Sequence, residues 1–136
     1  MPNDPPMPTD AELAILRVLW THGPCTVRDV QDRLDREKPI GYTTVLKLLQ
    51  IMLEKGLVAR DESQRAHVYA AHVSEPTTQQ RLVDDLMERA FGGSAQQLVM
   101  QALGGRSVSS EELDAIRTIL DNLDVQTDDD VSGNTN

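Results

Sequence analysis

The sequence predicts a mostly α-helical fold with one small β-hairpin, and three features support this fold class. Apolar residues recur at spacings of three and four along most of the 136 residues, as amphipathic helices require. Residues 9–12 and 26–29 each start with threonine and end in a carboxylate, which is the capping-box pattern of a helix start. Two short strand candidates, 57–60 and 67–70, flank a polar tip, as the strands of a hairpin do.

The third predicted helix, 41–56, has two chemically different faces. Gly41 supplies the turn before it, and Gly56 is the expected left-handed stop after it. At 100° per residue, one side collects the apolar residues Val45, Leu48, Leu49 and Met52. The opposite side collects Thr43, Lys47 and Gln50, whose polar groups suit phosphate oxygens and base edges. An ordinary solvated helix face looks the same, so the neighbouring elements must decide.

Three short helices followed by a hairpin form the layout of a winged helix-turn-helix. In that arrangement the third helix enters the major groove of DNA and the hairpin is the wing. Arg65 at the hairpin tip is the best wing contact; its alternative is a solvated loop charge paired with Asp61 or Glu62. The predicted DNA-binding residues are Arg28, Tyr42, Thr43, Thr44, Lys47, Gln50, Arg65 and His67.

The second half of the chain is helical in pattern throughout. We predict a disordered N-terminus at 1–8, a winged-helix DNA-binding domain at 9–73, a helical dimerisation region at 74–124 and a disordered acidic tail at 125–136. Three helices of about 50 residues in total cannot bury their apolar stripes alone, so a second copy of the chain is the simplest partner. A ligand pocket between these helices is the alternative. The predicted dimerisation residues are Leu82, Leu86, Met87, Phe91, Leu98, Leu113, Ile116, Leu120 and Leu123.

Charge and composition are compatible with this division. The formal net charge is −9, but residues 11–71 are nearly balanced and the acidity lies outside them. A single cysteine, Cys25, excludes an internal disulfide and fits a reducing compartment. No apolar run reaches the roughly 18 residues of a membrane span, and the N-terminus does not resemble a signal peptide. We therefore expect a cytoplasmic protein without membrane insertion.

Catalytic motifs are not found in the sequence. It has no Walker glycines, nucleophile elbow or His-Glu-x-x-His pair, and its three histidines are scattered. We expect neither an enzyme nor a cofactor nor a metal site. Cys25 is either a small packing residue or a redox sensor, and the first is the more common use of a lone cysteine between helices.

A series of short motifs resembles the penicillinase-repressor (BlaI/MecI) family. The matching segments run in register from about residue 9 to residue 123. They are Leu19-Trp20, 26–30 (Thr-Val-Arg-Asp-Val), 42–46 (Tyr-Thr-Thr-Val-Leu), 55–58 (Lys-Gly-Leu-Val), Tyr69, 91–94 (Phe-Gly-Gly-Ser), Leu98-Val99, and Ser109 with Glu112-Leu113.

This resemblance implies a homodimeric winged-helix repressor that binds an inverted-repeat operator and blocks transcription. By analogy, Thr43, Thr44 and Lys47 would touch the operator, with Arg65 on the wing. Family members are typically induced when a membrane-bound sensor metalloprotease leads to their cleavage in the dimerisation region. The equivalent bond lies near Gln101–Ala102, where better-known members have Asn-Phe; otherwise Ala102 is a core residue of a short helix.

Two further alternatives stay open at this point. Winged helices also serve as protein–protein docking modules without DNA contact, and the acidic balance favours that use slightly. A small molecule bound at the dimer interface is another way to induce such a repressor.

Overall fold

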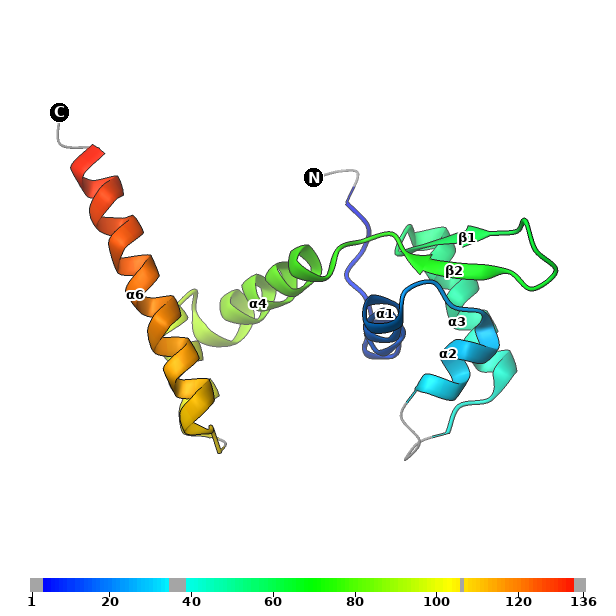
Figure 1. Ribbon diagram of the computed structural model, residues 1–136, viewed down its shortest axis with the longest axis horizontal. Helices are drawn as coiled ribbons and strands as arrows, with labels where there is room; N and C mark the ends of the chain where they lie inside the picture. The colour runs from blue at the N-terminus through cyan, green and yellow to red at the C-terminus, as the bar shows by residue number, and fades with distance from the viewer. Residues whose placement is uncertain (1–3, 35–38, 106, 134–136) are drawn as a thin grey trace. The chain divides into compact units, whose positions relative to one another are not determined.

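The computed structural model describes residues 4–34, 39–105 and 107–133, and confirms the predicted fold class (Figure 1). These residues form six helices and a two-stranded antiparallel sheet. The elements are, in order, α1 (Asp10–His22), α2 (Val27–Arg33), α3 (Tyr42–Lys55), β1 (Val58–Asp61), β2 (Val68–Ala71), α4 (Glu75–Phe91), α5 (Ala95–Gly104) and α6 (Ser110–Gly133). The chain divides into two compact units, residues 1–86 and 87–136.

Both predicted capping boxes are present. The Thr9 hydroxyl accepts from the Glu12 amide at 3.3 Å, and the Glu12 carboxylate accepts from the Thr9 amide at 2.8 Å. Thr26 and Asp29 exchange the same two bonds at the start of α2, at 3.1 and 3.2 Å. Hydrogen bonds from the backbone and then the side chain of Thr26 hold the pKa of Asp29 below its ordinary value. These bonds satisfy amide groups that a helix start otherwise leaves unpaired.

The hairpin begins one residue later than the sequence predicted. Leu57 donates its amide to the Met52 carbonyl and so completes the end of α3, after Gly56 has taken the left-handed conformation at φ 82°. The strand ladder therefore starts at Val58, which pairs with Ala71. On its other side, β2 forms a bridge between Tyr69 and Cys25, with N–H to O distances of 2.9 and 2.7 Å. The α1–α2 loop is thereby attached to the hairpin.

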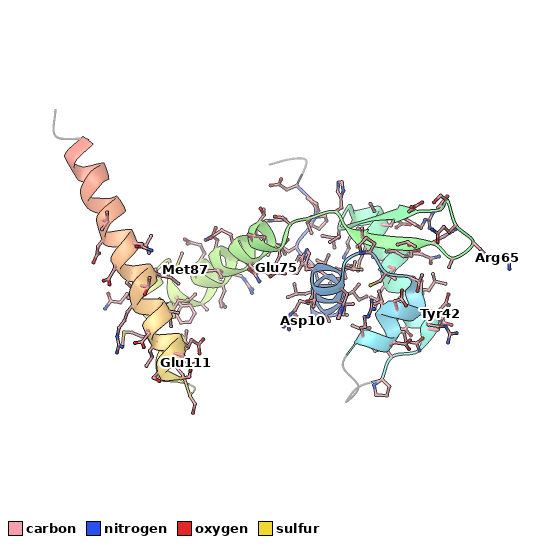
Figure 2. The ribbon with its side chains drawn as sticks, in the orientation of Figure 1. Asp10, Tyr42, Arg65, Glu75, Met87 and Glu111 are labelled. Carbon is pink, nitrogen blue, oxygen red and sulfur yellow. The ribbon has the colours of Figure 1, made fainter. Side chains whose placement is uncertain are left out.

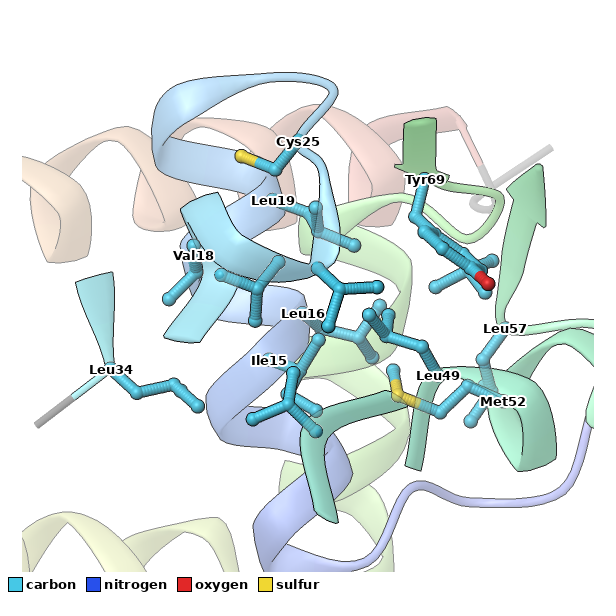
Figure 3. Close-up of a cluster of buried hydrophobic side chains, with 14 residues drawn as sticks. Ile15, Leu16, Val18, Leu19, Cys25, Leu34, Leu49, Met52, Leu57 and Tyr69 are labelled. Carbon is cyan, nitrogen blue, oxygen red and sulfur yellow. The ribbon is translucent and has the colours of Figure 1, made fainter. Parts of the chain in front are cut away.

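One hydrophobic core holds the first unit together (Figure 3). In the described parts of the chain, every buried hydrophobic side chain lies between Ile15 and Tyr69. The core residues are Ile15, Leu16, Val18, Leu19, Cys25, Val27, Val30, Leu34, Val45, Leu49, Met52, Leu57, Val58 and Tyr69. Most come from α1, α2, α3 and both strands, and Cys25, Leu34 and Leu57 lie just outside these elements. Packing therefore fixes the orientation of all three helices and the hairpin.

The beginning of α4 belongs with the first unit. The indole N–H of Trp20 donates to the Val73 carbonyl at 3.0 Å, and Thr78 is 5% exposed. The two units divide after Leu86, inside α4, whereas the sequence placed the boundary before residue 74. The reason is that the hydrogen bond from Trp20 of α1 to Val73 holds the residues just before α4 against the first unit.

The two chain ends differ from the predicted disordered segments. Pro5, Met7 and Pro8 are half-buried without regular secondary structure, and Pro5 lies beside Gly56. At the other end, α6 continues to Gly133, although the sequence placed the start of a tail at residue 125. No glycine or proline occurs between Ser110 and Gly133, so no helix-stopping residue intervenes. Residues 1–3 and 134–136 lie outside the described residues.

Candidate nucleic-acid interface

The outer face of α3 presents a row of polar side chains. Thr43, Lys47 and Gln50 are exposed at spacings of four and three, and Thr44 is exposed beside them. In the described structure none of these side chains makes a hydrogen bond or an ion pair within the protein. The opposite face of the same helix is completely buried at Val45, Leu49 and Met52. Helical periodicity thus leaves one face for the core and the other for a partner.

A surface hollow of about 490 Å³ lies next to this face. It is bounded by the start of α2, the first turns of α3 and the hairpin. Its lining residues are Thr26, Val27, Arg28, Tyr42, Leu46, Arg65, Ala66, His67 and Tyr69. Four of the predicted DNA-binding residues (Arg28, Tyr42, Arg65 and His67) therefore meet at one place. Tyr42 and Arg65 are labelled at the start of α3 and near the hairpin tip in Figure 2.

The apolar part of the hollow was not predicted from sequence. Val27 and Leu46 form the apolar part of its lining, although both lie on helix faces that also contact the core. Their helical spacing indicates burial, and only the crossing of α2 and α3 leaves them at the edge of a hollow.

The hollow is lined by three basic side chains that point to solvent. Arg28, Arg65 and His67 are exposed, and none has a hydrogen-bonding or ionic partner among the described residues. The expected alternative for Arg65, a pair with Asp61 or Glu62, is not found among these residues. Glu62 pairs with Arg60 instead, and Asp61 accepts from the Ser63 amide at 2.9 Å. The side chain of Ser63 and then its backbone amide hold the pKa of Asp61 below its ordinary value.

Arg60 is thereby distinguished from Arg65. The Tyr69 hydroxyl, followed by the Glu62 carboxylate, raises the pKa of Arg60 above its ordinary value. Since Glu62 neutralises Arg60 within the hairpin, Arg65 is the wing arginine that stays available to an external anion.

The start of α3 adds a favourable field for an anion. Gly41 occupies the N-cap position with no side-chain cap, and the first turn contains no acidic residue. The first amides of a helix lack partners within the helix and carry a partial positive charge. Tyr42 stands at this turn and lines the hollow. Together, the polar row, the hollow and the uncapped turn form one continuous surface suited to phosphate and base edges.

The helices of the C-terminal half expose apolar side chains. Of the predicted dimerisation residues, Leu86, Leu120 and Leu123 are exposed by 45%, 53% and 51%. The other six are half-buried, namely Leu82, Met87, Phe91, Leu98, Leu113 and Ile116. The structure adds exposed apolar side chains that were not predicted, at Val83, Val99, Met100, Ile119 and Val125.

Residues 101 and 102 lie on a helix with little packing. Both Gln101 and Ala102 are exposed on α5, and this helix has no buried residue. The alternative in which Ala102 is a core residue is therefore not found within the chain.

Other candidate chemistry is limited. Cys25 is buried, and its Sγ accepts from Arg33 at 3.1 Å and lies 3.2 Å from the Gly23 carbonyl. No three potential metal-ligating side chains lie together among the residues that the structure describes. Within the same residues, the helices are all too short or too polar to cross a membrane.

Fold and surface define a winged-helix protein of the DNA-binding class. The sequence matches the family model described as penicillinase repressor over residues 8–122, and the chain belongs to this family. It is therefore a DNA-binding transcriptional repressor and not an enzyme, as the sequence predicted.

Individual relatives share much of the chain. It is 33% identical over 117 residues to the transcriptional regulator BlaI of Mycobacterium tuberculosis (strain ATCC 25618 / H37Rv), covering 85% of this chain and 83% of that protein. The penicillinase repressor of Bacillus licheniformis is 23% identical over 116 residues, covering 85% and 91%. The solution structure of monomeric Bacillus licheniformis BlaI with the blaP half-operator matches with 25% identity and a TM-score of 0.46, covering 53% of this chain and 88% of that one.

Proposed function

We propose that the protein represses transcription as a homodimer bound to an inverted-repeat operator. Each protomer places the exposed face of α3 in one major groove. The observation that carries this proposal is the unpaired row of Thr43, Lys47 and Gln50, directly opposite the buried face of the same helix. Hydroxyl, ammonium and amide groups at helical spacing can each reach a base edge or a phosphate oxygen. Thr44, exposed on α3 beside this row, would contact the adjoining DNA strand.

The hollow beside α3 positions the protein on the sugar–phosphate backbone. Arg65 on the wing and Arg28 on α2 contact backbone phosphates, and Tyr42 and His67 line the same hollow. Contacts of this kind fix register and orientation, and they make affinity depend on salt. The site of action is the cytoplasm, where the operator DNA lies.

The C-terminal half supplies the dimer contact. Leu86, Leu120 and Leu123 expose about half of their surface, and isolated helices of this kind are marginal in water. Because each leucine is already about half covered, burying its exposed part against a second copy contributes roughly 0.8–1.5 kcal/mol, so several such residues together support a stable pair. Two-fold symmetry then matches the two halves of an inverted repeat.

Derepression occurs by cleavage near Gln101–Ala102 through a membrane sensor metalloprotease pathway. Helix α5 is flanked by Gly92-Gly93 and ends at Gly104-Gly105, and none of its side chains is buried. Local opening of such a helix costs little free energy, which gives a protease an extended substrate. Loss of the segments after residue 101 would separate the winged helix from part of its dimer contact.

Fluorescence anisotropy tests the operator proposal. The duplex is DNA from upstream of the protein's own coding region, with a shuffled duplex as comparison, across a salt series. We expect tighter binding to the native fragment, at two protomers per site, and a steep decrease with salt. Equal or absent binding to every promoter tested would favour the docking-module alternative, which the net charge of −9 suits.

A substitution on the exposed face of α3 tests whether this helix makes the operator contact. Lys47→Ala should weaken operator binding and lower the salt slope by about one, because one phosphate or base contact is lost. Arg17→Ala is the matched control, since Arg17 is an exposed cation on α1 outside the proposed interface. Unchanged affinity and sequence preference for Lys47→Ala would rule out the assignment of this face.

A further inference from the structure

The hairpin contains a second arginine, Arg60, whose charge is matched within the hairpin itself. Arg60 on β1 stands opposite Tyr69 on β2 in the strand ladder. Its Nη2 forms an ion pair with Oε1 of Glu62, two residues further along the chain. The Tyr69 hydroxyl, followed by the Glu62 carboxylate, holds the pKa of Arg60 above its ordinary value. Arg60 is therefore a cation that two groups of its own hairpin already engage.

We propose that Glu62 limits the affinity of the wing for DNA: its carboxylate takes the place of a backbone phosphate on Arg60 and so withholds this cation from the duplex. The inference rests on the contact between wing and DNA backbone proposed above, and it adds a residue that opposes this contact. Its consequence is that neutralising Glu62 strengthens binding to any duplex, and that the gain depends on Arg60.

Arg60 lies close to the proposed interface. The Tyr69 side chain, which bonds to Arg60, also lines the hollow between α2, α3 and the hairpin. Arg28 and Arg65, the two arginines proposed to contact phosphates, line the same hollow. A single side chain thus separates Arg60 from this hollow. The side chain of Arg60 is 27% exposed, so its charge is accessible to an external anion once Glu62 is removed.

The pair with Glu62 leaves the guanidinium of Arg60 incompletely satisfied. The ion pair joins one nitrogen to one oxygen, and the Nε of Arg60 is buried without a hydrogen-bond partner in the part of the chain that the structure describes. A guanidinium offers five N–H donors in a fork that suits carboxylate and phosphate oxygens equally. Glu62 and a backbone phosphate therefore compete for the same donors.

The neighbouring carboxylate, Asp61, differs from Glu62 in its partner. Asp61 is exposed and accepts from the Ser63 amide at 2.9 Å, and it pairs with no arginine among the described residues. Both carboxylates lie in the same wing, but only Glu62 neutralises an arginine there. The Glu62 side chain is 55% exposed, and ion pairs of this exposure contribute little to stability. Neutralising Glu62 should therefore leave the fold intact.

Fluorescence anisotropy with the native and the shuffled duplex tests the proposal. Glu62→Gln should bind both duplexes more tightly than the wild type, with a salt slope steeper by about one, because Arg60 gains one phosphate. The advantage of the variant should be about threefold larger at about 50 mM salt than at about 200 mM. Asp61→Asn is the matched control: it removes one charge from the same wing without releasing an arginine, so its salt slope should stay at the wild-type value.

A double-mutant cycle assigns the gain to Arg60. Arg60→Gln alone should leave DNA affinity and salt slope near the wild-type values, because Glu62 already withholds Arg60. Glu62→Gln added to Arg60→Gln should then bring no further tightening. Thermal unfolding checks that Arg60→Gln is folded. If it is not, the comparison of Glu62→Gln with Asp61→Asn still decides, because both variants keep Arg60.

Failure of the operator proposal is distinguishable from failure of this inference. Equal binding of the wild type to both duplexes would remove the operator preference, whereas the effect of Glu62 is expected on either duplex. Three outcomes overturn the inference alone: an unchanged affinity and salt slope in Glu62→Gln, equal gains in Glu62→Gln and Asp61→Asn, or a gain that persists in the Arg60→Gln background. Absence of binding to both duplexes in wild type and Glu62→Gln would overturn both proposals.

Discussion

Lys55, at the end of α3, donates to both carboxylate oxygens of Glu12, at the start of α1, over 3.0 and 2.8 Å. The Glu12 side chain is 2% exposed and that of Lys55 is 29% exposed. Burial acts to raise the pKa of Glu12, but the hydrogen bonds from Lys55 and Thr9 outweigh it, and the net pKa is lowered. The buried Glu12 carboxylate thus caps the start of α1 and, through Lys55, links α3 to α1.

Removing this charge should destabilise the first unit. Glu12→Gln is expected to lower the free energy of unfolding by about 1–3 kcal/mol, because Lys55 and the Thr9 amide lose a charged acceptor. Urea unfolding followed by the fluorescence of Trp20 measures the change. Asp114→Asn is the control, since its pair with Arg117 is about 70% exposed on both sides and should contribute little. A change below about 0.5 kcal/mol in Glu12→Gln would contradict the role of the pair.

The same pair makes stability depend on pH on the acid side. Because the folded-state pKa of Glu12 is lowered, its contribution is complete above the unfolded-state value of about 4.3 and is lost as pH falls through the folded value. Wild-type protein should therefore lose stability below about pH 4.5 more steeply than Glu12→Gln. Parallel curves for the two proteins between pH 3 and pH 6 would show that Glu12 is not the group responsible.

Substitutions on the two faces of α3 should have different effects, one on the free energy of unfolding and the other on operator binding. Leu49→Ala empties a fully buried position and is expected to cost about 2–5 kcal/mol of unfolding free energy. Lys47→Ala, on the exposed face, should change stability by less than about 0.5 kcal/mol while weakening operator binding. Thermal unfolding and anisotropy on both variants provide the comparison. A Lys47→Ala variant that unfolds as readily as Leu49→Ala would mean that the face is structural.

Charge placed on the exposed apolar side chains of α6 should oppose dimerisation. Leu120→Glu and Leu123→Glu together are expected to shift sedimentation from dimer to monomer, since both side chains are about half exposed in the single chain and would be buried in a pair. Thr118→Glu, on an exposed residue of the same helix, is the matched control. Operator binding should weaken in the double variant because a monomer contacts only one half-site and no longer benefits from the linked second contact of the pair. A double variant that remains dimeric would place the interface elsewhere.

Protease sensitivity should be greatest around α5. This ten-residue helix has no buried side chain, and the glycines before it take positive φ values of 57° and 82°. Brief digestion with a low-specificity protease should cut within 92–105 before it cuts α1, α2 or α3, as mass spectrometry of the fragments would show. First cuts within 42–55 would instead indicate that the winged-helix unit opens more readily than α5.

Much of the fold could be predicted because it is encoded locally. The capping boxes at Thr9 and Thr26, the glycine stop at Gly56 and the two faces of α3 depend on residues within a few positions of one another. The first strand was predicted one residue early because the Leu57 amide completes the end of α3. The tail was predicted from residue 125 because the acidic residues 128–130 were interpreted as part of a disordered segment, whereas α6 extends to Gly133.

By itself, the sequence determined the class of fold, the family and the residues that face outward from α3. Periodicity and capping act over one or two turns, so they can be read along the chain. Only the tertiary structure decided that Glu12 meets Lys55, that the start of α4 is fastened to Trp20, and that Arg28, Tyr42, Arg65 and His67 surround one hollow. These relationships join residues from different elements, and helix crossing and strand register set them through packing of the common core.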